Sequence, residues 1–455
     1  MEDLLKKVNE IVWGAPALIG ILYIGFYLSV RTGFAQLRFF PKALKMFLAA
    51  FRRSKEKNSD VRPFQALCTA LAATVGTGNL AGVAGAITIG GPGAVFWMWV
   101  SAILGMVTKF AEATLSVRFR FRDKNGELVG GPMYMITQGL GEKWHFLAAI
   151  YSFFGVVAAF GVGNATQINA IIGGVNQVIT TWGGNETLQG NLVMGTILAV
   201  ILCGILLGGM SKIGRAAEKM VPFASACYLL LGLGVLIMRA QYIPQAFRDI
   251  LTSAFTPRAV TGGAVGSFFI ALRIGVSRGV FTNEAGMGTA GIAHAAADVH
   301  HPVQQGMMGI MEVFLDTILI CTMTALVILV SGVPIPYETD VGVTLTTKAF
   351  SAIYGDWVAV LIALALCCFA IATVLGWGLY GARCAQFLFG EGVWKKFVLL
   401  QGMIIVVGAV LKTGTVWLLS ETVNGLMAIP NLIALFALTP ELVRLVKQYR
   451  LKGID

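Results

Sequence analysis

Runs of apolar residues, each long enough to cross a bilayer as a helix, recur along the whole chain of 455 residues. A transmembrane helix needs about 20 mostly apolar residues. The pattern predicts an all-α membrane protein with about eleven transmembrane helices and no separate soluble domain. The expected segments are roughly 13–30, 64–89, 92–117, 146–180, 191–209, 219–238, 264–297, 303–331, 357–382, 394–411 and 415–440.

Basic residues lie mostly in alternate loops between these segments. The side that begins with loop 31–62 and includes the C-terminus holds 24 Lys and Arg residues, whereas the other side holds seven. Loops rich in Lys and Arg stay in the cytoplasm. The asymmetry predicts an odd number of spans in the cell membrane, with the N-terminus outside and the C-terminus in the cytoplasm.

Within the first basic loop, apolar residues recur at helical spacing from Leu44 to Phe51, with basic residues between and after them. This amphipathic pattern is typical of a helix that lies in the membrane interface. We therefore expect a short interfacial helix here, and a solvated linker is the alternative.

The composition excludes several other classes of protein. Hydrophobic residues make up 56% of the chain and charged residues only 13%, against about 45–50% and about 25% in average soluble domains. A mean hydropathy of +0.77 rules out a soluble enzyme and a secreted disulfide scaffold. The net charge of +11 is accounted for by the basic loops, so it does not indicate nucleic-acid binding. The seven cysteines form no C-x-x-C pair, and we read them as small apolar residues.

The segment at 64–89 is interrupted by the sequence Gly76-Thr77-Gly78-Asn79. Glycine weakens a helix, and asparagine competes for backbone hydrogen bonds. If the helix unwinds here, Val75 and its neighbours offer free carbonyls, and Thr77, Gly78 and Asn79 offer free amides. Carbonyls suit Na⁺ or an ammonium, and amides at a helix start suit a carboxylate. Close helix packing through glycine is the alternative.

A second interruption is expected in 272–284, where Arg273, Arg278 and Glu284 stand among apolar residues. Charges inside a membrane usually face a cavity or a partner. Arg278 and Glu284 are candidates to pair with each other, and three other carboxylates are further candidates: Glu112, Glu312 and Asp316. An ion pair that closes a gate or fixes packing is favoured for Arg278 over substrate contact.

The two interrupted segments are five spans apart, which indicates an internal repeat. Because five is odd, the second set of five helices enters the membrane from the opposite face. Paired interrupted helices of this kind mark the binding site in many transporters. The expected organisation is a first span with the interfacial helix in 1–62, and five-helix repeats in 63–240 and 241–455.

Other polar residues stand on apolar segments. Asn164 and Gln167 are three residues apart and share a helix face, as do Thr373 and Trp377, which are four apart. An interhelical hydrogen bond or core packing is the alternative to a binding role for each. The histidines that follow the seventh segment, among them His294, are expected in a loop.

Seven stretches of the chain make it similar to the alanine/glycine:cation symporter family, a branch of the amino acid–polyamine–organocation superfamily. The matching stretches are TALAATVGTGNLAGVAGA from Thr69, GGPGAVFWMW from Gly90, GGPMY from Gly130, GNATQ from Gly163, RGVFTNEAGMGTA from Arg278, ATVLGW from Ala372 and MAIPNLIAL from Met427. The resemblance covers nearly the whole chain. It implies a leucine-transporter-like fold, a 5+5 inverted repeat with broken first and sixth core helices. It also implies Na⁺- or H⁺-driven import of alanine, glycine or similar small amino acids.

The resemblance also implies a binding site. The substrate carboxylate is expected at the amides of Thr77 and Gly78, with Asn79 beside them, and the ammonium at Gln167. The side chains expected to approach from the later spans are Phe269, Ile270, Ile274 and Trp377. The Na⁺ ligands are expected from Ala72, Val75, Phe369 and Thr373.

Two residues depart from the family pattern. Relatives often have a serine where this chain has Ala372, which removes one oxygen from the expected Na⁺ site. Arg273 stands where some relatives have an apolar residue, and it would alter the substrate range if it faced the pocket.

The sequence thus predicts a Na⁺-coupled importer of alanine and glycine that works by alternating access, and a proton-coupled symporter of the same fold is the alternative. The expected partners are the amino acid and the lipid bilayer, with no nucleic acid, and the protein is expected to be a monomer. An ion channel is disfavoured because the paired breaks lie within one chain. An intramembrane enzyme is disfavoured because no G-x-S-x-G, H-E-x-x-H or facing pair of catalytic carboxylates is found.

Overall fold

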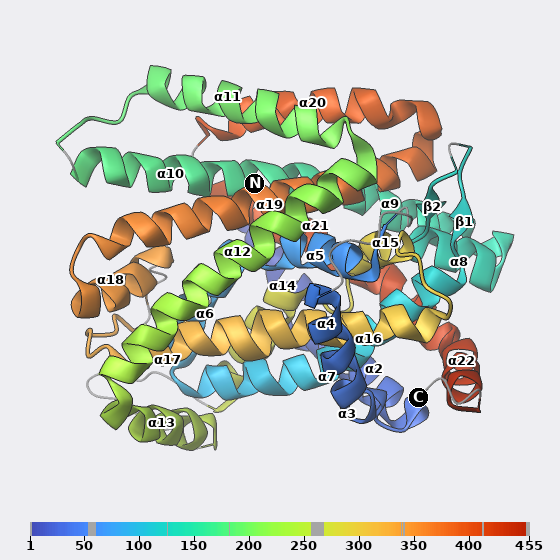
Figure 1. Ribbon diagram of the computed structural model, residues 1–455, viewed down its shortest axis with the longest axis horizontal. Coiled ribbons are helices and arrows are strands. Elements are labelled where there is room, and N and C mark those ends of the chain that lie inside the picture. Colours follow the sequence, from blue (N-terminus) through green and yellow to red (C-terminus); the bar gives the residue numbers. More distant parts are fainter. Residues whose placement is uncertain are drawn as a thin grey trace.

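The computed structural model describes residues 2–52, 61–124, 126–181, 183–255, 268–337, 339, 342–411 and 414–451, and nearly all of them are helical (Figure 1). The α-helices are α1 (Glu2–Val12), α2 (Ala15–Thr32), α3 (Ala35–Arg38), α4 (Phe40–Arg52), α5 (Pro63–Thr74), α6 (Val83–Gly90), α7 (Gly93–Arg118), α8 (Pro132–Leu140), α9 (His145–Phe160), α10 (Thr166–Thr181), α11 (Leu188–Leu206), α12 (Gly209–Met238), α13 (Ile243–Phe255), α14 (Phe268–Asn283), α15 (Thr289–Ala295), α16 (Pro302–Val313), α17 (Thr322–Val330), α18 (Val343–Tyr354), α19 (Val358–Phe389), α20 (Trp394–Gly408), α21 (Gly414–Ala437) and α22 (Thr439–Leu451).

Shorter elements complete the chain. Three π-helical segments lie inside longer helical stretches: η1 (Gly78–Gly82), η3 (Gly161–Ala165) and η5 (Phe314–Cys321). Three 3₁₀ turns precede helices: η2 (Glu142–Trp144), η4 (Ala240–Tyr242) and η6 (Glu391–Val393). The strands β1 (Phe121–Arg122) and β2 (Leu128–Val129) form an antiparallel hairpin with Phe121 opposite Val129.

Each of the eleven expected apolar segments falls on one or more of these helices. Within the described residues, seven helices are long and apolar enough to cross a membrane, or nine if each of two sharply bent pairs is one span. At the two remaining positions, α14 and α20 have 16 and 15 residues, and residues 256–267 before α14 lie outside the described part of the chain. Eleven spans therefore stays a prediction.

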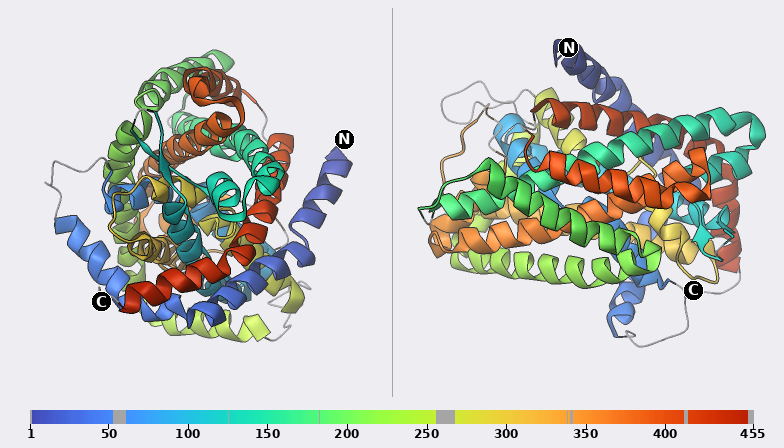
Figure 2. Two further views of the ribbon diagram at one scale, coloured as in Figure 1. Left: turned by 90° about the vertical axis from the view of Figure 1, so that its right-hand side faces the viewer. Right: turned by 90° about the horizontal axis from the view of Figure 1, so that it is seen from above.

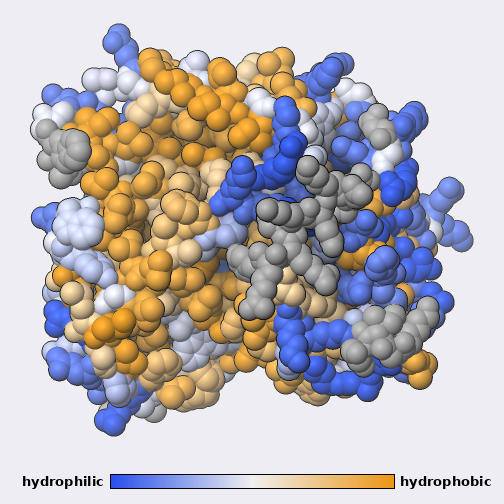
Figure 3. Space-filling model, in the orientation of Figure 1, coloured by the Kyte–Doolittle hydropathy of each residue, from blue (hydrophilic) through white to orange (hydrophobic). Residues whose placement is uncertain are grey.

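The long helices run roughly parallel to the longest axis of the molecule (Figures 1 and 2). The half-helices α5 and α6 lie at the centre, and every residue of α5 from Phe64 to Thr74 is buried. By contrast, α12 exposes large apolar side chains such as Phe223, Leu230 and Ile237. Exposed side chains of this kind suit hydrocarbon, and Figure 3 shows orange apolar surface over the middle of the molecule.

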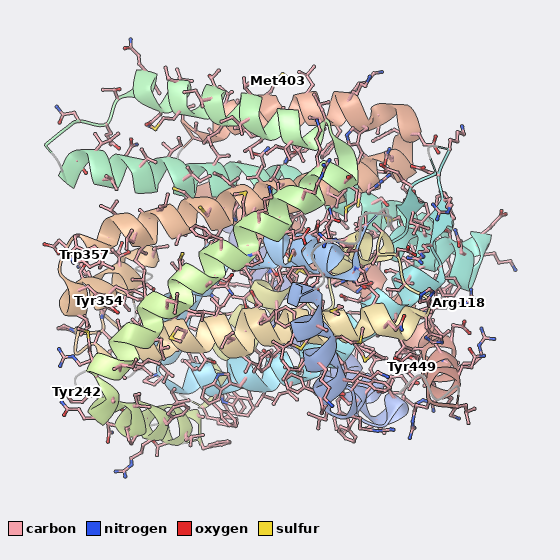
Figure 4. All side chains as sticks on the ribbon, viewed as in Figure 1. Arg118, Tyr242, Tyr354, Trp357, Met403 and Tyr449 are labelled. Atoms are coloured by element: carbon pink, nitrogen blue, oxygen red, sulfur yellow. The ribbon has the colours of Figure 1, made fainter. Side chains whose placement is uncertain are left out.

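Hydrophilic residues gather at the end of the molecule where α8, α22 and the hairpin lie (Figure 3). Arg118 and Tyr449 lie at this end, whereas Tyr242, Tyr354 and Trp357 lie at the opposite end (Figure 4). Aromatic residues are enriched where a protein crosses the membrane surface. The long axis is therefore the direction in which the helices cross the bilayer.

The short helix expected in the first basic loop is present as α4 (Phe40–Arg52). Its apolar residues Leu44 and Phe47 are half-buried, whereas Leu48 is exposed. Its position relative to lipid stays a prediction.

The second break lies later in the chain than the sequence indicated. Helix α14 continues through Gly275 and Gly279 to Asn283, and the break occupies 284–288. Glu284 has φ of 53°, and Gly286 and Gly288 have φ of 97° and 78°. A side chain at Gly275 would collide with the backbone of α7 at Ala94, so this glycine permits close helix packing and does not unwind the helix.

Candidate functional site

The first break lies where expected, between α5 and α6. Val75 is extended, with φ of −75° and ψ of 104°, and the chain is helical again from Thr77. The two half-helices are bent by 56° relative to each other. The backbone amides of Thr77 and Gly78 lie in the first turn of the second half-helix, where amides have no acceptor within their own helix.

The side chain of Asn79 explains which carbonyls the break releases. The side-chain Oδ1 accepts a hydrogen bond from the backbone amide of Gly76 at 2.8 Å. The backbone amide of Asn79 donates to the Gly76 carbonyl at 3.3 Å. In a continuous helix these two amides would bond to the carbonyls of Ala72 and Val75. Both carbonyls thereby lose their usual helical donors.

Asn79 does not line a cavity, in contrast to its expected place beside the substrate. Its Nδ2 donates to Oδ1 of Asp316 at 2.7 Å, and Oδ2 of Asp316 accepts from Thr317 at 2.8 Å. These buried bonds tie the break to η5. Because the Asn79 amide is bound to Gly76, only Thr77 and Gly78 retain the amides expected for a carboxylate.

A cavity of about 30 Å³ lies between the two breaks. It is enclosed by α5, η1, α14, η3, α10, α19 and α21. Four residues expected in the site line it, namely Thr77, Gly78, Gln167 and Thr373. The other lining residues are Ala73, Thr74, Gly76, Val162, Phe281, Thr282, Glu284 and Asn424.

Two amide side chains present hydrogen-bond acceptors to this cavity. Gln167 is 4% exposed and donates through Nε2 to the Val162 carbonyl at 3.1 Å. Within the described residues, neither Oε1 of Gln167 nor Oδ1 of Asn424, which is 1% exposed, has a hydrogen-bond partner. A buried polar group without a partner costs about 1–3 kcal/mol. The cavity is therefore suited to a ligand that donates hydrogen bonds.

Sequence reasoning missed Asn424. It lies on α21, three residues before the MAIPNLIAL stretch and just after the polar residues Ser420, Glu421 and Thr422. A polar residue inside a predicted span is itself a signal. It carries no information about which neighbouring helix it faces, and only the packing of α21 brings it to the cavity.

The residues expected to bind Na⁺ lie on two adjoining helices. Gly376 of α19 packs against Ala73 of α5, since a Cβ there would lie 3.0 Å from the Ala73 nitrogen. The Thr373 hydroxyl donates to the Phe369 carbonyl at 3.0 Å. A Cβ at Gly76 would lie 3.0 Å from the same hydroxyl oxygen, so Thr373 directly faces the break.

Three other expected residues lie outside the cavity lining. Phe269 and Ile270 are 75% and 37% exposed at the start of α14. They precede Glu284 by about 22 Å of helix at 1.5 Å per residue, because the break comes later than expected. Ile274 instead lines a second cavity.

Trp377 lies behind the cavity. It is fully buried, its Nε1 donates to Oε1 of Glu284 at 3.1 Å, and it packs against Gly163, where any side chain would overlap its ring. Trp377 therefore holds the carboxylate of Glu284 at the cavity and does not itself line it. Oε2 of Glu284 accepts from Thr289 at 2.6 Å.

The second cavity, of about 160 Å³, lies between α1, α14 and α21. Arg273, Arg278 and Phe281 line it together with Glu421, and Phe281 also lines the inner cavity. Arg278 lies 3.5 Å from Glu421 and does not pair with Glu284, because Glu284 lies in the break and faces Trp377. Arg273 is thus placed outside the inner cavity.

Two fully buried charged clusters support the second break from α7. Lys109 pairs with Glu312 at 2.9 Å, and the other oxygen of Glu312 is 2.9 Å from Nε2 of His294. His294 lies on α15 and is fully buried, so the expectation of a loop histidine is wrong.

The second cluster is built on Glu112. Its Oε1 accepts from the amides of Gly286 and Gly288 at 2.9 and 3.1 Å and from Asn431 at 2.8 Å. These bonds fix the left-handed turn of the break. Across the described ranges, no group of three or more His, Cys, Asp or Glu residues is arranged to hold a metal ion.

Comparison with known proteins gives a consistent result. Residues 1–453 match the model of the sodium:alanine symporter family. The chain is 41% identical over 453 residues to the sodium/alanine symporter AgcS of Methanococcus maripaludis, covering 98% of this chain and 97% of that protein. It is 43% identical over 453 residues to an uncharacterized transporter of Haemophilus influenzae, covering 99% and 96% of the two chains.

Solved structures show the same fold at low sequence identity. MhsT in complex with L-phenylalanine matches with a TM-score of 0.58 and 13% identity, over 87% of this chain and 99% of that one. A Na⁺-coupled sialic acid symporter matches with a TM-score of 0.54 and 12% identity, over 89% and 82%. The expected leucine-transporter-like fold is confirmed.

Proposed function

The chain belongs to the sodium:alanine symporter family, and we propose that it imports alanine and glycine together with Na⁺ by alternating access. It is a membrane transporter and not an enzyme. The observation that carries the substrate assignment is a cavity that is lined by Thr77 and Gly78 at the start of a half-helix and that holds two amide oxygens, from Gln167 and Asn424, without a partner within the described residues. An amino acid zwitterion needs this combination of donors and acceptors.

The substrate carboxylate binds at the start of the second half-helix. The amides of Thr77 and Gly78 provide hydrogen bonds, and the positive end of the helix dipole favours the negative charge. Gly78 contributes no side chain, and a Cβ there would already lie 3.4 Å from Thr282. The carboxylate can therefore approach the backbone closely.

The substrate ammonium binds Oε1 of Gln167 and Oδ1 of Asn424. Both oxygens are buried and lack a partner within the described residues, and an ammonium supplies three donors. Hydrogen bonds to a charged group contribute about 1.5–3 kcal/mol each, more than those between neutral groups. These two side chains therefore determine most of the affinity for the ammonium.

The volume of the cavity limits the substrate to small side chains. About 30 Å³ has room for about two water molecules, which is less than an alanine needs, so the cavity must widen for any substrate and most for one with a large side chain. Phe281 closes the space toward the second cavity. A larger substrate requires movement of Phe281 or Thr282, so alanine and glycine are preferred.

Na⁺ is transported with the amino acid and binds beside it. The carbonyls of Ala72 and Val75, released by the break, and the Thr373 hydroxyl are its ligands, with Phe369 contributing its carbonyl. Bound Na⁺ stabilises the unwound conformation that presents the amides of the break. Affinity for the substrate then rises with Na⁺, which is the coupling that symport requires. Ala372 supplies no oxygen, so proton coupling remains the alternative.

The proposal extends to the arrangement of the protein in the cell membrane. The N-terminus is outside and the C-terminus is in the cytoplasm, as the basic loops indicate. Residues 63–240 and 241–455 form the two repeats, following 1–62. The protein works as a monomer, since one chain encloses the cavity.

Uptake of labelled alanine and glycine into proteoliposomes tests the function. An inward Na⁺ gradient should drive accumulation, whereas a matched K⁺ gradient should not. The same measurement with Gln167→Ala, and with Asn164→Ala as a control on the same helical stretch, tests the site. Uptake that is driven by a proton gradient in the absence of Na⁺ would identify H⁺ as the coupling ion. Absence of alanine and glycine uptake under every gradient would overturn the substrate assignment.

A further inference from the structure

A basic groove lies between α3, α4 and α22, away from the transport cavity. It has a volume of about 640 Å³, and its lining includes Arg38, Lys42, Lys45 and Arg450 above the apolar Phe39 and Met46. No Asp or Glu belongs to this lining among the residues that the structure describes. Four positively charged side chains from α3, α4 and α22 therefore line one groove.

The floor of the basic groove is held in a fixed shape by aromatic contacts. Phe39 stacks on Phe110 of α7, with 5.9 Å between the ring centroids, and packs edge-on against Tyr449 of α22, with 6.1 Å between the centroids. The Lys42 ammonium lies 5.0 Å from the centre of the Tyr449 ring. These contacts pack the floor of the groove against α7 and α22.

The acidic residue of α22 is already paired with cations outside the basic groove. Glu441, on the same helix as Arg450, is bound by Arg118 at 2.8 Å and by Arg444 at 2.6 Å. Its charge is therefore already compensated. A ligand with negative charge would complement the cations of Arg38, Lys45 and Arg450 in the groove.

The surroundings indicate that this ligand is amphiphilic. The lining is itself partly apolar, through Phe39, Pro41, Met46 and Ala49. Leu37 and Leu48, next in sequence to the lining residues Arg38 and Ala49, are 57% and 54% exposed and extend this apolar rim. Exposed apolar side chains beside a cluster of cations are typical of the boundary between headgroups and hydrocarbon. A free inorganic anion would gain nothing from this apolar rim, whereas a lipid would use both parts.

We propose that the basic groove binds the headgroup of an anionic glycerophospholipid, with the phosphate among Arg38, Lys45 and Arg450 and the acyl chains along the apolar rim. Basic pockets between helices at the cytoplasmic surface suit such headgroups. The groove is also connected to the transport machinery. The rings of Phe47 on α4 and Phe64 on α5 pack together, with 6.0 Å between their centroids. A lipid that stabilises α4 therefore also stabilises the helix that leads to the first break.

Native mass spectrometry of the full-length protein in detergent tests the proposal, with equal amounts of phosphatidylglycerol and phosphatidylcholine added. The wild type should retain phosphatidylglycerol selectively. Each basic residue near an anionic surface contributes about fivefold in affinity, so the variant R38Q/K45Q/R450Q should bind about 100-fold more weakly. The variant R38K/K45R/R450K should restore binding, which separates charge from folding.

The matched control is K143Q/K395Q/K396Q, which removes three exposed charges from the same end of the molecule outside the groove. It should leave lipid binding within about twofold. An equal loss in the control, or equal retention of the two lipids, would overturn the proposal in favour of diffuse surface charge. Displacement of the lipid by millimolar inorganic phosphate would assign the site to a free anion instead. Co-purification of an acidic protein that competes with the lipid would also overturn it.

If the triple variant fails to fold, R450Q alone should weaken binding about fivefold, and unchanged binding would contradict the proposal.

Discussion

The Oδ1 atom of Asn79 lies 2.8 Å from the backbone nitrogen of Gly76, three residues earlier in the chain. This bond occupies the amide that would otherwise pair with the carbonyl of Ala72. The same side chain reaches Asp316 at 2.7 Å on a helical segment more than 200 residues later. A single asparagine therefore shapes the break and attaches it to the second half of the molecule.

Replacing Asn79 with alanine should damage both stability and coupling. The change removes the acceptor of the Gly76 amide and the Asn79 donor to Oδ1 of Asp316, which costs roughly 3 kcal/mol for buried groups. We expect a fall of several degrees in the unfolding temperature and loss of Na⁺-dependent uptake. Thermal unfolding and uptake in proteoliposomes check these effects. Normal uptake in this variant would show that the Asn79 bond is not needed for the break.

Gln167→Ala should weaken alanine binding about 10- to 100-fold, because it removes a hydrogen bond to a charged group. Folding should change little, since Nε2 of Gln167 makes only one bond, to Val162. Equilibrium binding of labelled alanine to purified protein measures the effect. Asn164→Ala is the control, because Asn164 bonds to the Gln401 carbonyl and lies outside the cavity lining. Equal affinity in the two variants would remove Gln167 from the site.

Thr373→Ala should raise the Na⁺ concentration for half-maximal uptake by about tenfold, through loss of one oxygen ligand worth about 1.4 kcal/mol. The reverse change at the neighbouring position, Ala372→Ser, should lower it. Uptake measured over a range of Na⁺ concentrations tests both variants together. If Thr373→Ala leaves the Na⁺ dependence unchanged, the ion binds elsewhere.

Gly78→Leu should abolish transport and leave the protein folded. A Cβ at Gly78 would make only ordinary contacts with Thr282 and Phe281, but a longer side chain would fill the cavity. Gly173→Leu on α10 is the control, because a Cβ there meets no atom within 4 Å. Size-exclusion profiles and uptake separate folding from function. Transport at the normal rate by Gly78→Leu would contradict close approach of the substrate to this backbone.

Breaking the Lys109–Glu312 pair should destabilise the protein far more than breaking the Arg278–Glu421 pair. Lys109 and Glu312 are fully buried, so Lys109→Met leaves Glu312 with His294 alone and costs about 3–5 kcal/mol. Arg278 and Glu421 are partly exposed and 3.5 Å apart, so Arg278→Gln should cost about 1 kcal/mol or less. Thermal unfolding in one detergent compares the two variants. Similar losses would indicate that Lys109 is not desolvated.

The first break was predictable because its cause is local. The sequence Gly76-Thr77-Gly78-Asn79 carries both the weak helix formers and the side chain that competes for the backbone. The Val75 carbonyl was expected from that position, whereas the Ala72 carbonyl was expected only from the resemblance to the family. The expected cavity residues Gln167 and Thr373 were also identified, since each is polar on an apolar segment.

The second break was misplaced because its cause is not local. Gly275 and Gly279 look like helix breakers in the sequence, but they serve close contact with α7. The actual break is stabilised by Glu112, more than 170 residues earlier. Phe269 and Ile270 were expected in the site from the resemblance to the family, and they lie at the exposed start of α14, far before the actual break. Positions that depend on contacts between distant helices were beyond reasoning from spacing alone.

Phe281 belongs to the walls of both cavities, so its ring lies between the inner cavity and the second one. A side chain turns in nanoseconds or less, whereas packed helices rearrange in microseconds to milliseconds. In the proposed cycle, the Phe281 side chain therefore rotates many times, each time allowing a bound amino acid to leave, before the helices rearrange once and transport it. The fraction of captures that end in transport is set by how long this ring stays closed, and the efficiency of the pump depends on a residence time as well as on an affinity.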